Sequence, residues 1–131
     1  MRLFWPCVIL VLATGLVYVN SFPGAFHFDD FPLLLENPRI NGSAFSYSSF
    51  LEQYGGRPLT LWTFYWNHQL FGQNPSSYHL VSVLCHLLVV VEIFLLIWQL
   101  FGQRALAFGS ALLFAIHPLN TQAVNYIWSR S

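Results

Sequence analysis

The chain has 131 residues, of which 56% are hydrophobic and only 8% are charged, and its formal net charge is zero. An ordinary soluble domain carries roughly 25% charged residues, so this composition excludes a conventional water-soluble fold. Nucleic-acid binding is also excluded, because five arginines without any lysine offer no basic face for phosphates. The two cysteines, Cys7 and Cys85, lie in apolar runs and provide neither a disulfide framework nor metal-ligand spacing.

The first uncharged stretch predicts a transmembrane helix within residues 1–19. Residues 3–19 contain no Asp, Glu, Lys or Arg, and at about 1.5 Å per residue they are just long enough to cross a bilayer core. A cleaved signal peptide is the alternative. The apolar run is longer than a usual signal sequence, and no A-x-A-like cleavage site follows it, so a retained helix is favoured.

Residues 20–77 are predicted to form an external loop, because they are rich in Pro, Gly, Asn and Ser and hold most of the acidic residues. Aromatic side chains recur at helical spacing over residues 50–54 and again over 59–71. The second of these segments is bounded by glycines and predicts a helix along the membrane surface. It carries three residues of the types that favour interfacial depth: Trp62, Tyr65 and Trp66.

A second transmembrane helix is predicted over residues 78–101, and a third begins the segment 105–131. The third is short, since its apolar run stops at His117-Pro118 and resumes toward Trp128. The predicted fold class is therefore an all-α membrane protein with about three transmembrane helices and an external loop that contains short interfacial helices. Arg2 and Arg104 favour a cytoplasmic location for the membrane ends beside them, which turns the acidic loop outward.

Adjacent carboxylates at Asp29 and Asp30 are the most informative polar feature of the loop. Paired acids at a membrane face can raise one another's pKa so that one acts as a general base, or they can hold a divalent cation. The alternative is a turn or helix cap before Pro32, which this motif alone favours. Arg57 follows two glycines and can reach a phosphate at the membrane surface, or it can simply anchor the interfacial helix.

Three polar residues of the second transmembrane helix, His79, Ser82 and His86, have the spacing i, i+3 and i+7 and share one helix face. This face is expected to meet a cavity or other helices, and hydrogen bonding between helices explains it as well as ligand binding does. Zinc binding is not favoured, since no further ligands have suitable spacing. Glu92 lies on another face and is expected to pair with a further helix or to be protonated. The predicted topology also brings His117 to the membrane face of Asp29 and Asp30.

Together, these features resemble the polytopic GT-C glycosyltransferases, and within them the transmembrane and tetratricopeptide-repeat-containing O-mannosyltransferases and their bacterial relatives. The order and spacing of the motifs carry the resemblance, which covers the chain from the first helix onward. The matching motifs are F-H-F-D-D-F-P at residues 26–32, E-N-P-R-I at 36–40, R-P-L-T at 57–60, N-P-S-S-Y-H-L-V at 74–81 with His86, and L-L-F-A-I-H-P-L-N-T-Q-A-V at 112–124.

The resemblance implies a membrane enzyme that moves a sugar, such as mannose, from a polyprenyl-phosphate donor to a protein or glycan acceptor on the outer or lumenal face. By resemblance, Asp29 and Asp30 occupy the catalytic acidic motif, as a base toward the acceptor hydroxyl or as ligands of a divalent cation, the one cofactor considered. Arg57, His79 and His117 fall near the carrier-binding cavity, without a defined role for each.

Two departures from the family pattern matter. The eukaryotic members read H-P-x-H-T-E-A where this chain has Asn120 and Gln122, so any role of that second histidine and of the carboxylate does not carry over. Such enzymes also have many more membrane helices, which predicts that these 131 residues are an N-terminal piece and inactive alone.

A small non-catalytic membrane subunit or scaffold is the alternative to an enzyme, and a transporter fragment is disfavoured because most of the acids lie in a loop. The expected location is a multi-pass protein in contact with membrane lipid. The absence of lysine favours a bacterial inner membrane, with the endoplasmic reticulum membrane as the alternative.

Overall fold

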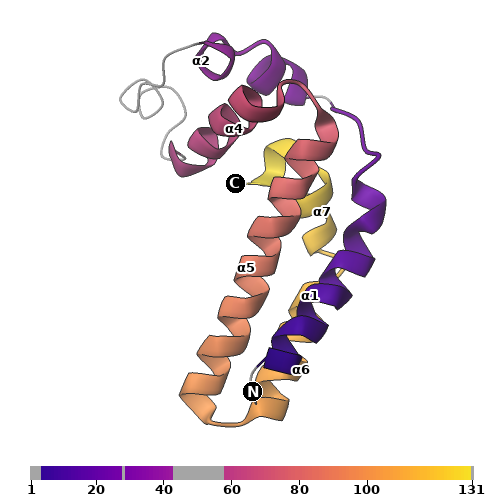
Figure 1. Cartoon of the computed structure of the whole chain (residues 1–131), viewed down its shortest axis with the longest axis vertical. Coiled ribbons are helices and arrows are strands. Elements are labelled where there is room, and N and C mark those ends of the chain that lie inside the picture. Colours follow the sequence, from indigo (N-terminus) through magenta and orange to yellow (C-terminus); the bar gives the residue numbers. More distant parts are fainter. Residues whose placement is uncertain (1–3, 28, 43–57, 131) are drawn as a thin grey trace.

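The computed structural model describes residues 4–27, 29–42 and 58–130, and these residues form an all-helical structure. Its axis is α5 (Pro75–Phe101), which spans about 40 Å at 1.5 Å per residue. Against α5 pack α1 (Phe4–Tyr18) and α6 (Arg104–Ile116), which also contact each other (Figure 1). The three helices form one elongated bundle.

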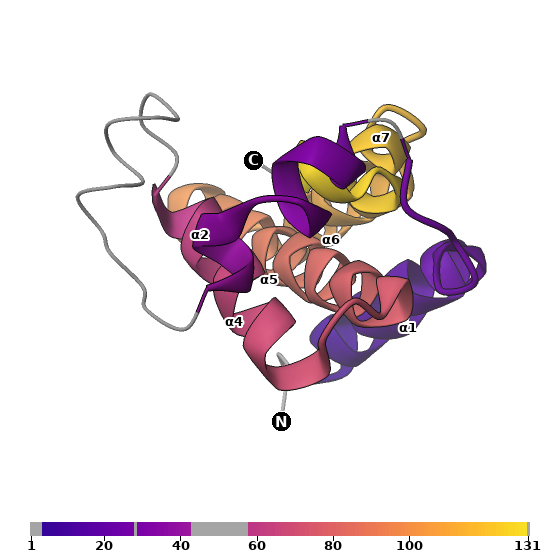
Figure 2. The ribbon, with the colours of Figure 1, turned by 90° about the horizontal axis from the view of Figure 1, so that it is seen from above.

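Short helical elements surround one end of this bundle. They are η1, a 3₁₀ turn (Val19–Ser21); η2, a π-helical turn (Phe31–Leu35); α2 (Pro38–Asn41); α4 (Pro58–Phe71); α7 (Asn120–Asn125); and η3, a second 3₁₀ turn (Ile127–Arg130). Viewed from above, α4 and α1 lie on opposite sides of α5 (Figure 2), and both contact it. The predicted helix at residues 59–71 is confirmed, whereas the one at residues 50–54 lies outside the described residues.

Local sequence signals set the two ends of α5. The Asn74 side chain accepts a hydrogen bond from the Ser76 N–H at 3.2 Å, and Pro75 occupies the first turn, where it is best tolerated. At the other end, Gly102 adopts a left-handed conformation (φ 67°) and its N–H donates to the Trp98 carbonyl at 2.8 Å. The helix therefore starts three residues before the predicted boundary, because an N-cap and proline precede the apolar run.

In the part of the chain that the structure describes, two helices have the length and apolarity needed to cross a membrane, Phe4–Ser21 and Pro75–Phe101, so the third predicted crossing is not confirmed. The 13 residues of α6 span about 20 Å, short of a hydrocarbon core of about 30 Å. The helix stops because Pro118 disfavours helical geometry at the residue before it, and His117 is indeed extended (φ −67°, ψ 129°). The chain then continues along α5 as α7 and η3.

The core consists of three apolar clusters spaced along α5, which contributes a buried side chain to each. In the lower bundle, three alanines on one face of α6 allow close approach of the helix backbones. The clusters are Leu10, Val90, Phe94, Ala107, Ala111 and Ala115; then Tyr18, Val83 and Val124; and finally Leu34, Ile40, Leu61, Phe64, Tyr78 and Ile127. The helix α1 supplies Leu10 and Tyr18 to this core, and its identity as a retained transmembrane helix stays a prediction.

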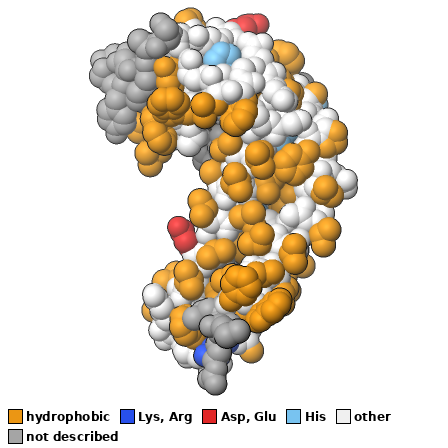
Figure 3. Space-filling model, in the orientation of Figure 1, with side chains coloured by type: hydrophobic (Ala, Val, Ile, Leu, Met, Phe, Trp, Pro, Cys, Tyr) orange, Lys and Arg blue, Asp and Glu red, His pale blue; other side chains and the backbone are white. Residues whose placement is uncertain are grey.

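The outer surface of the bundle is also apolar. Hydrophobic side chains cover most of its length on the face shown in Figure 3. Leu16 is 74% exposed and Leu88 is 65% exposed, on the two helices that are long enough to span a bilayer. Exposed leucines on this scale fit contact with lipid.

Candidate functional site

Asp30 connects the segment after α1 to the C-terminal part of the described chain. The side chain is fully buried, and each carboxylate oxygen accepts one backbone N–H: Oδ2 from His27 and Oδ1 from Trp128, both at 2.9 Å. The first contact closes the turn that precedes η2, and the second fixes η3 against that turn. Asp30 therefore has a positioning role in this structure.

Burial raises the pKa of the Asp30 carboxyl above its ordinary value, since desolvation disfavours the charged form. The two N–H donors and the positive potential of His27 and His79 act in the opposite direction and offset part of this effect. The two adjacent acids thus differ in environment, because Asp29 is exposed while Asp30 is inaccessible to solvent.

Asp29 lines an open groove of about 670 Å³ with His27, Gln122 and Tyr126. Tyr126 lies beside Asp29 in this groove and interacts with it electrostatically. Burial raises the pKa of the Tyr126 phenol, and the carboxylates of Asp29 and Asp30 raise it further, against the effect of the Asp29 backbone N–H. Tyr126 therefore remains neutral at physiological pH, with its phenol beside the exposed Asp29 carboxylate.

His79 lies beneath the loop that leads to these acids. It is 1% exposed, and a Cβ atom at Gly24 would lie 2.6 Å from its Nε2 atom. Only glycine allows the backbone to approach the imidazole this closely. The His79 ring also acts electrostatically on the Asp30 carboxyl. His79 therefore interacts with this loop at two points, at Gly24 and at Asp30.

The predicted polar face of α5 is confirmed as a buried face, because His79, Ser82 and His86 are all less than 9% exposed. Ser82 donates its hydroxyl proton to the Tyr78 carbonyl at 3.1 Å. The Nε2 atom of His86 lies 3.3 Å from the Ala115 carbonyl oxygen, and its ring packs between Tyr18 and Phe114. The lower part of the face thus joins α5 to α1 and α6.

The structure places the other predicted site residues apart from the Asp29 groove or outside the described residues. His117 lies at the exposed end of α6, where its Nδ1 atom accepts a hydrogen bond from the Leu119 N–H at 3.2 Å. Gln122 and Tyr126 line the groove from this part of the chain instead. Arg57 falls outside the described residues, so its predicted phosphate contact stays a prediction.

Sequence reasoning missed Tyr126 and the position of Gln122. The two residues are four apart, a spacing that places both on one side of a helical segment, and this was the available signal. Gln122 is also the residue that stands where the family pattern has a carboxylate. Consequently, that departure lies in the lining of the groove that contains Asp29.

Within residues 4–27, 29–42 and 58–130, no three His, Cys, Asp or Glu side chains come together as a metal site. Both Asp30 oxygens already accept backbone N–H groups. Asp29 is therefore the more available carboxylate should a divalent cation bind near the pair.

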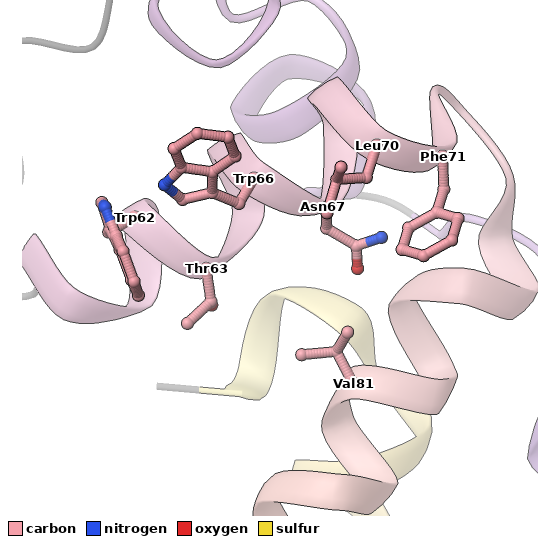
Figure 4. A pocket seen from close by; sticks show the side chains of 7 residues that line it. All are labelled: Trp62, Thr63, Trp66, Asn67, Leu70, Phe71 and Val81. Atoms are coloured by element: carbon pink, nitrogen blue, oxygen red, sulfur yellow. The ribbon is translucent and has the colours of Figure 1, made fainter.

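A second, apolar groove of about 290 Å³ separates α4 from α5 (Figure 4). Trp62 and Trp66 of α4 are half exposed beside it, as expected for a helix at the membrane surface, whereas Tyr65 is buried. At the floor of this groove, the Asn67 amide donates to the Ser77 hydroxyl oxygen at 2.8 Å and holds α4 on α5. The predicted interfacial helix therefore exposes its tryptophans and turns the tyrosine inward.

No protein-family model matches the chain, and no solved structure matches it closely enough to show a relationship. Its curated relatives are protein O-mannosyl-transferases. The chain is 34% identical over 137 residues to Protein O-mannosyl-transferase TMTC1 of Homo sapiens. This alignment covers 94% of this chain and 16% of that protein.

Two further relatives are also protein O-mannosyl-transferases. Protein O-mannosyl-transferase TMTC3 of Mus musculus is 33% identical over 98% of this chain and 15% of its own length. A protein O-mannosyl-transferase of Caenorhabditis elegans is 30% identical over 95% of this chain and 20% of its own length. The chain thus spans a fifth or less of the length of these relatives. Their animal sources do not support the predicted preference for a bacterial inner membrane.

Proposed function

We propose that this chain is part of a membrane glycosyltransferase that moves a sugar, mannose by analogy with the names of its relatives, from a polyprenyl-phosphate carrier to a hydroxyl of a protein or glycan acceptor. The observation that carries the proposal is the environment of Asp29. Its exposed carboxylate lies beside the Tyr126 phenol in an open groove that His27 and Gln122 also line. A carboxylate in such a position is suited to general-base catalysis.

In the proposed reaction, Asp29 takes the proton of the acceptor hydroxyl while the hydroxyl oxygen attacks the anomeric carbon of the sugar. The bond between that carbon and the phosphate oxygen of the carrier breaks, and the polyprenyl phosphate leaves with the electron pair. The Tyr126 phenol stays beside the carboxylate throughout. A divalent cation at Asp29 is an optional addition that would stabilise the leaving phosphate.

Asp30 acts as a positioning residue in this proposal, because it accepts the backbone N–H groups of His27, which lines the groove, and of Trp128, which lies two residues after the groove-lining Tyr126. We assign the carrier phosphate to Arg57, whose guanidinium suits a phosphate contact. His117 is proposed to contact the carrier from the α6 end, and His79 to act from beneath the loop, where it is buried.

We further propose the endoplasmic reticulum membrane as the location, with the groove on the lumenal side. Support comes from Arg104, which begins α6 in the short turn after α5. A basic residue beside a membrane end favours the cytoplasmic side, which places the opposite end of α5, with Asp29 and Asp30, on the lumenal side.

The test is sugar transfer by membranes that contain the full-length gene product. Polyprenyl-phosphate-mannose is the donor, and hydroxyl-bearing peptides are the acceptors. We expect Asp29→Asn to lower kcat at least 100-fold with little change in KM for the donor, since a general base contributes about 10²–10⁴-fold. Glu36→Gln is the matched control, because Glu36 is an exposed carboxylate outside the groove.

Two results would contradict the proposal. An Asp29→Asn protein that inserts normally and keeps more than half of its activity would remove the proposed base. Equal losses in Glu36→Gln would show that any loop carboxylate produces the effect.

A non-catalytic membrane scaffold is the second candidate, and the presence of Gln122 in the groove favours it. An amide cannot take up a proton as a carboxylate does, so the groove lacks the second acid of the family pattern. If wild-type membranes transfer no sugar under conditions in which a relative does, the scaffold function replaces the enzymatic one.

A further inference from the structure

The middle of α5 carries a polar side chain that none of the described contacts uses. Glu92 is exposed on the surface of the bundle, although it belongs to the more hydrophobic of the two candidate membrane spans. Glu92 lies nine positions before Phe101, so it is about 14 Å from that end of the helix. This distance places it near the centre of a hydrocarbon core of about 30 Å. A carboxylate at this depth either takes up a proton or meets a cation.

The neighbours of Glu92 form a pattern that is typical of helix packing. Val89, Glu92, Leu96 and Gln99 are all exposed and follow one another at spacings of three, four and three residues. This is the spacing of a seam between two helices that cross at a small angle. A shallow hollow of about 390 Å³ runs along this seam, and Ile93 and Leu95 complete its lining.

The described helices leave this seam uncovered. The opposite side of α5 faces α1 and α6, where Val90 and Phe94 are fully buried in the core. We propose that the seam at Val89, Glu92, Leu96 and Gln99 is the docking surface for a membrane-spanning helix from outside these 131 residues, and that this helix brings a Lys or Arg side chain to Glu92. This assignment does not depend on the glycosyltransferase activity.

Charge complementarity selects this occupant over a second copy of the chain. Neither α1 nor α5 contains Lys or Arg. Two copies that met symmetrically through the seam would place Glu92 against Glu92, and like charges are least tolerated where the dielectric constant is low. A helix with a cation at the level of Glu92 satisfies the carboxylate. Gln99 offers a hydrogen-bonding group at the last position of the seam.

The test uses a hydrophobic carbodiimide, which reacts with protonated carboxyl groups inside membranes and spares ionised ones. We expect the Glu92 adduct, measured by peptide mass spectrometry, to form at least tenfold more slowly in native membranes than in phosphatidylcholine vesicles that contain only the purified chain. Leu96→Trp fills the seam and is expected to restore labelling in native membranes. Leu84→Trp is the matched control, because Leu84 is exposed about 120° from Leu96 and about 80° from Glu92 around α5 and should leave Glu92 protected.

Equal and rapid labelling in both membranes would overturn the proposal, since Glu92 would then be protonated and face lipid. Protection in the pure vesicles that disappears on dilution with lipid would also overturn it, because a second copy of the chain would be the occupant. Restored labelling in both tryptophan variants would place the contact elsewhere on α5.

Discussion

Replacing Asp30 with alanine tests whether this side chain fixes the turn at His27 to the segment at Trp128. The substitution removes the acceptor of two backbone N–H groups, those of His27 and Trp128, in a fully buried position. A hydrogen bond to a charged group contributes about 1.5–3 kcal/mol, and each 1.4 kcal/mol corresponds to a factor of ten in a local opening equilibrium. We therefore expect amide hydrogen exchange at both residues to become about 10- to 150-fold faster.

The assay is hydrogen exchange read by mass spectrometry or NMR on the chain in detergent micelles. The amide of Val90, in the buried middle of α5, reports global unfolding and separates it from local opening. Asp30→Asn keeps one carbonyl oxygen, so we expect only one of the two amides to lose its protection. Asp29→Asn is the matched control and should change neither amide, since Asp29 is exposed.

Exchange at His27 and Trp128 that stays within threefold of wild type in Asp30→Ala would refute this reasoning. The two N–H groups would then have acceptors other than the carboxylate. That result would also contradict the distinct roles assigned to Asp29 and Asp30.

Two more predictions concern stability. Gly24→Ala should lower the free energy of unfolding by about 1–3 kcal/mol in a denaturant titration, because the added Cβ would lie 2.6 Å from His79 Nε2 and 2.9 Å from the Ser21 carbonyl oxygen. Gly15→Ala meets no atom within 4 Å and should be neutral or stabilising, so equal losses in both variants would contradict the steric argument. The second prediction follows from the raised pKa of Asp30: the folded chain binds this proton more tightly than the unfolded chain does, so stability should fall as pH rises from about 3.9 through the raised value. Asp30→Asn should remove this slope from unfolding midpoints measured across that range, and a slope that persists in the variant would assign it to another group.

The helical elements were largely predictable because they depend on short-range signals. Uncharged apolar runs located α1 and α5, and the proline after His117 marked the end of α6. The number of membrane crossings was not predictable in the same way. Apolarity alone does not distinguish a 13-residue helix buried beside α5 from one that spans a bilayer, so the expected third crossing was not confirmed.

The candidate site was predictable in its residues and less so in its arrangement. Asp29 and Asp30 were identified as a pair, yet the sequence could not show that one is exposed and the other fully buried. That difference depends on Trp128, whose N–H reaches Asp30 across 98 residues of sequence, and on Tyr126, which contacts Asp29. Long-range pairings of this kind leave no trace in local periodicity.

The contact between Asp30 and Trp128 also affects the order of events during synthesis. The acidic loop leaves the ribosome early, but the N–H that secures it belongs to a residue made almost 100 positions later. Until α5, α6 and α7 have been synthesised and folded back along one another, the buried carboxylate lacks half of its hydrogen bonds. The groove is therefore expected to be among the last features to mature, and a pause in translation within α6 would leave the nascent chain with an unsatisfied acid beside the membrane.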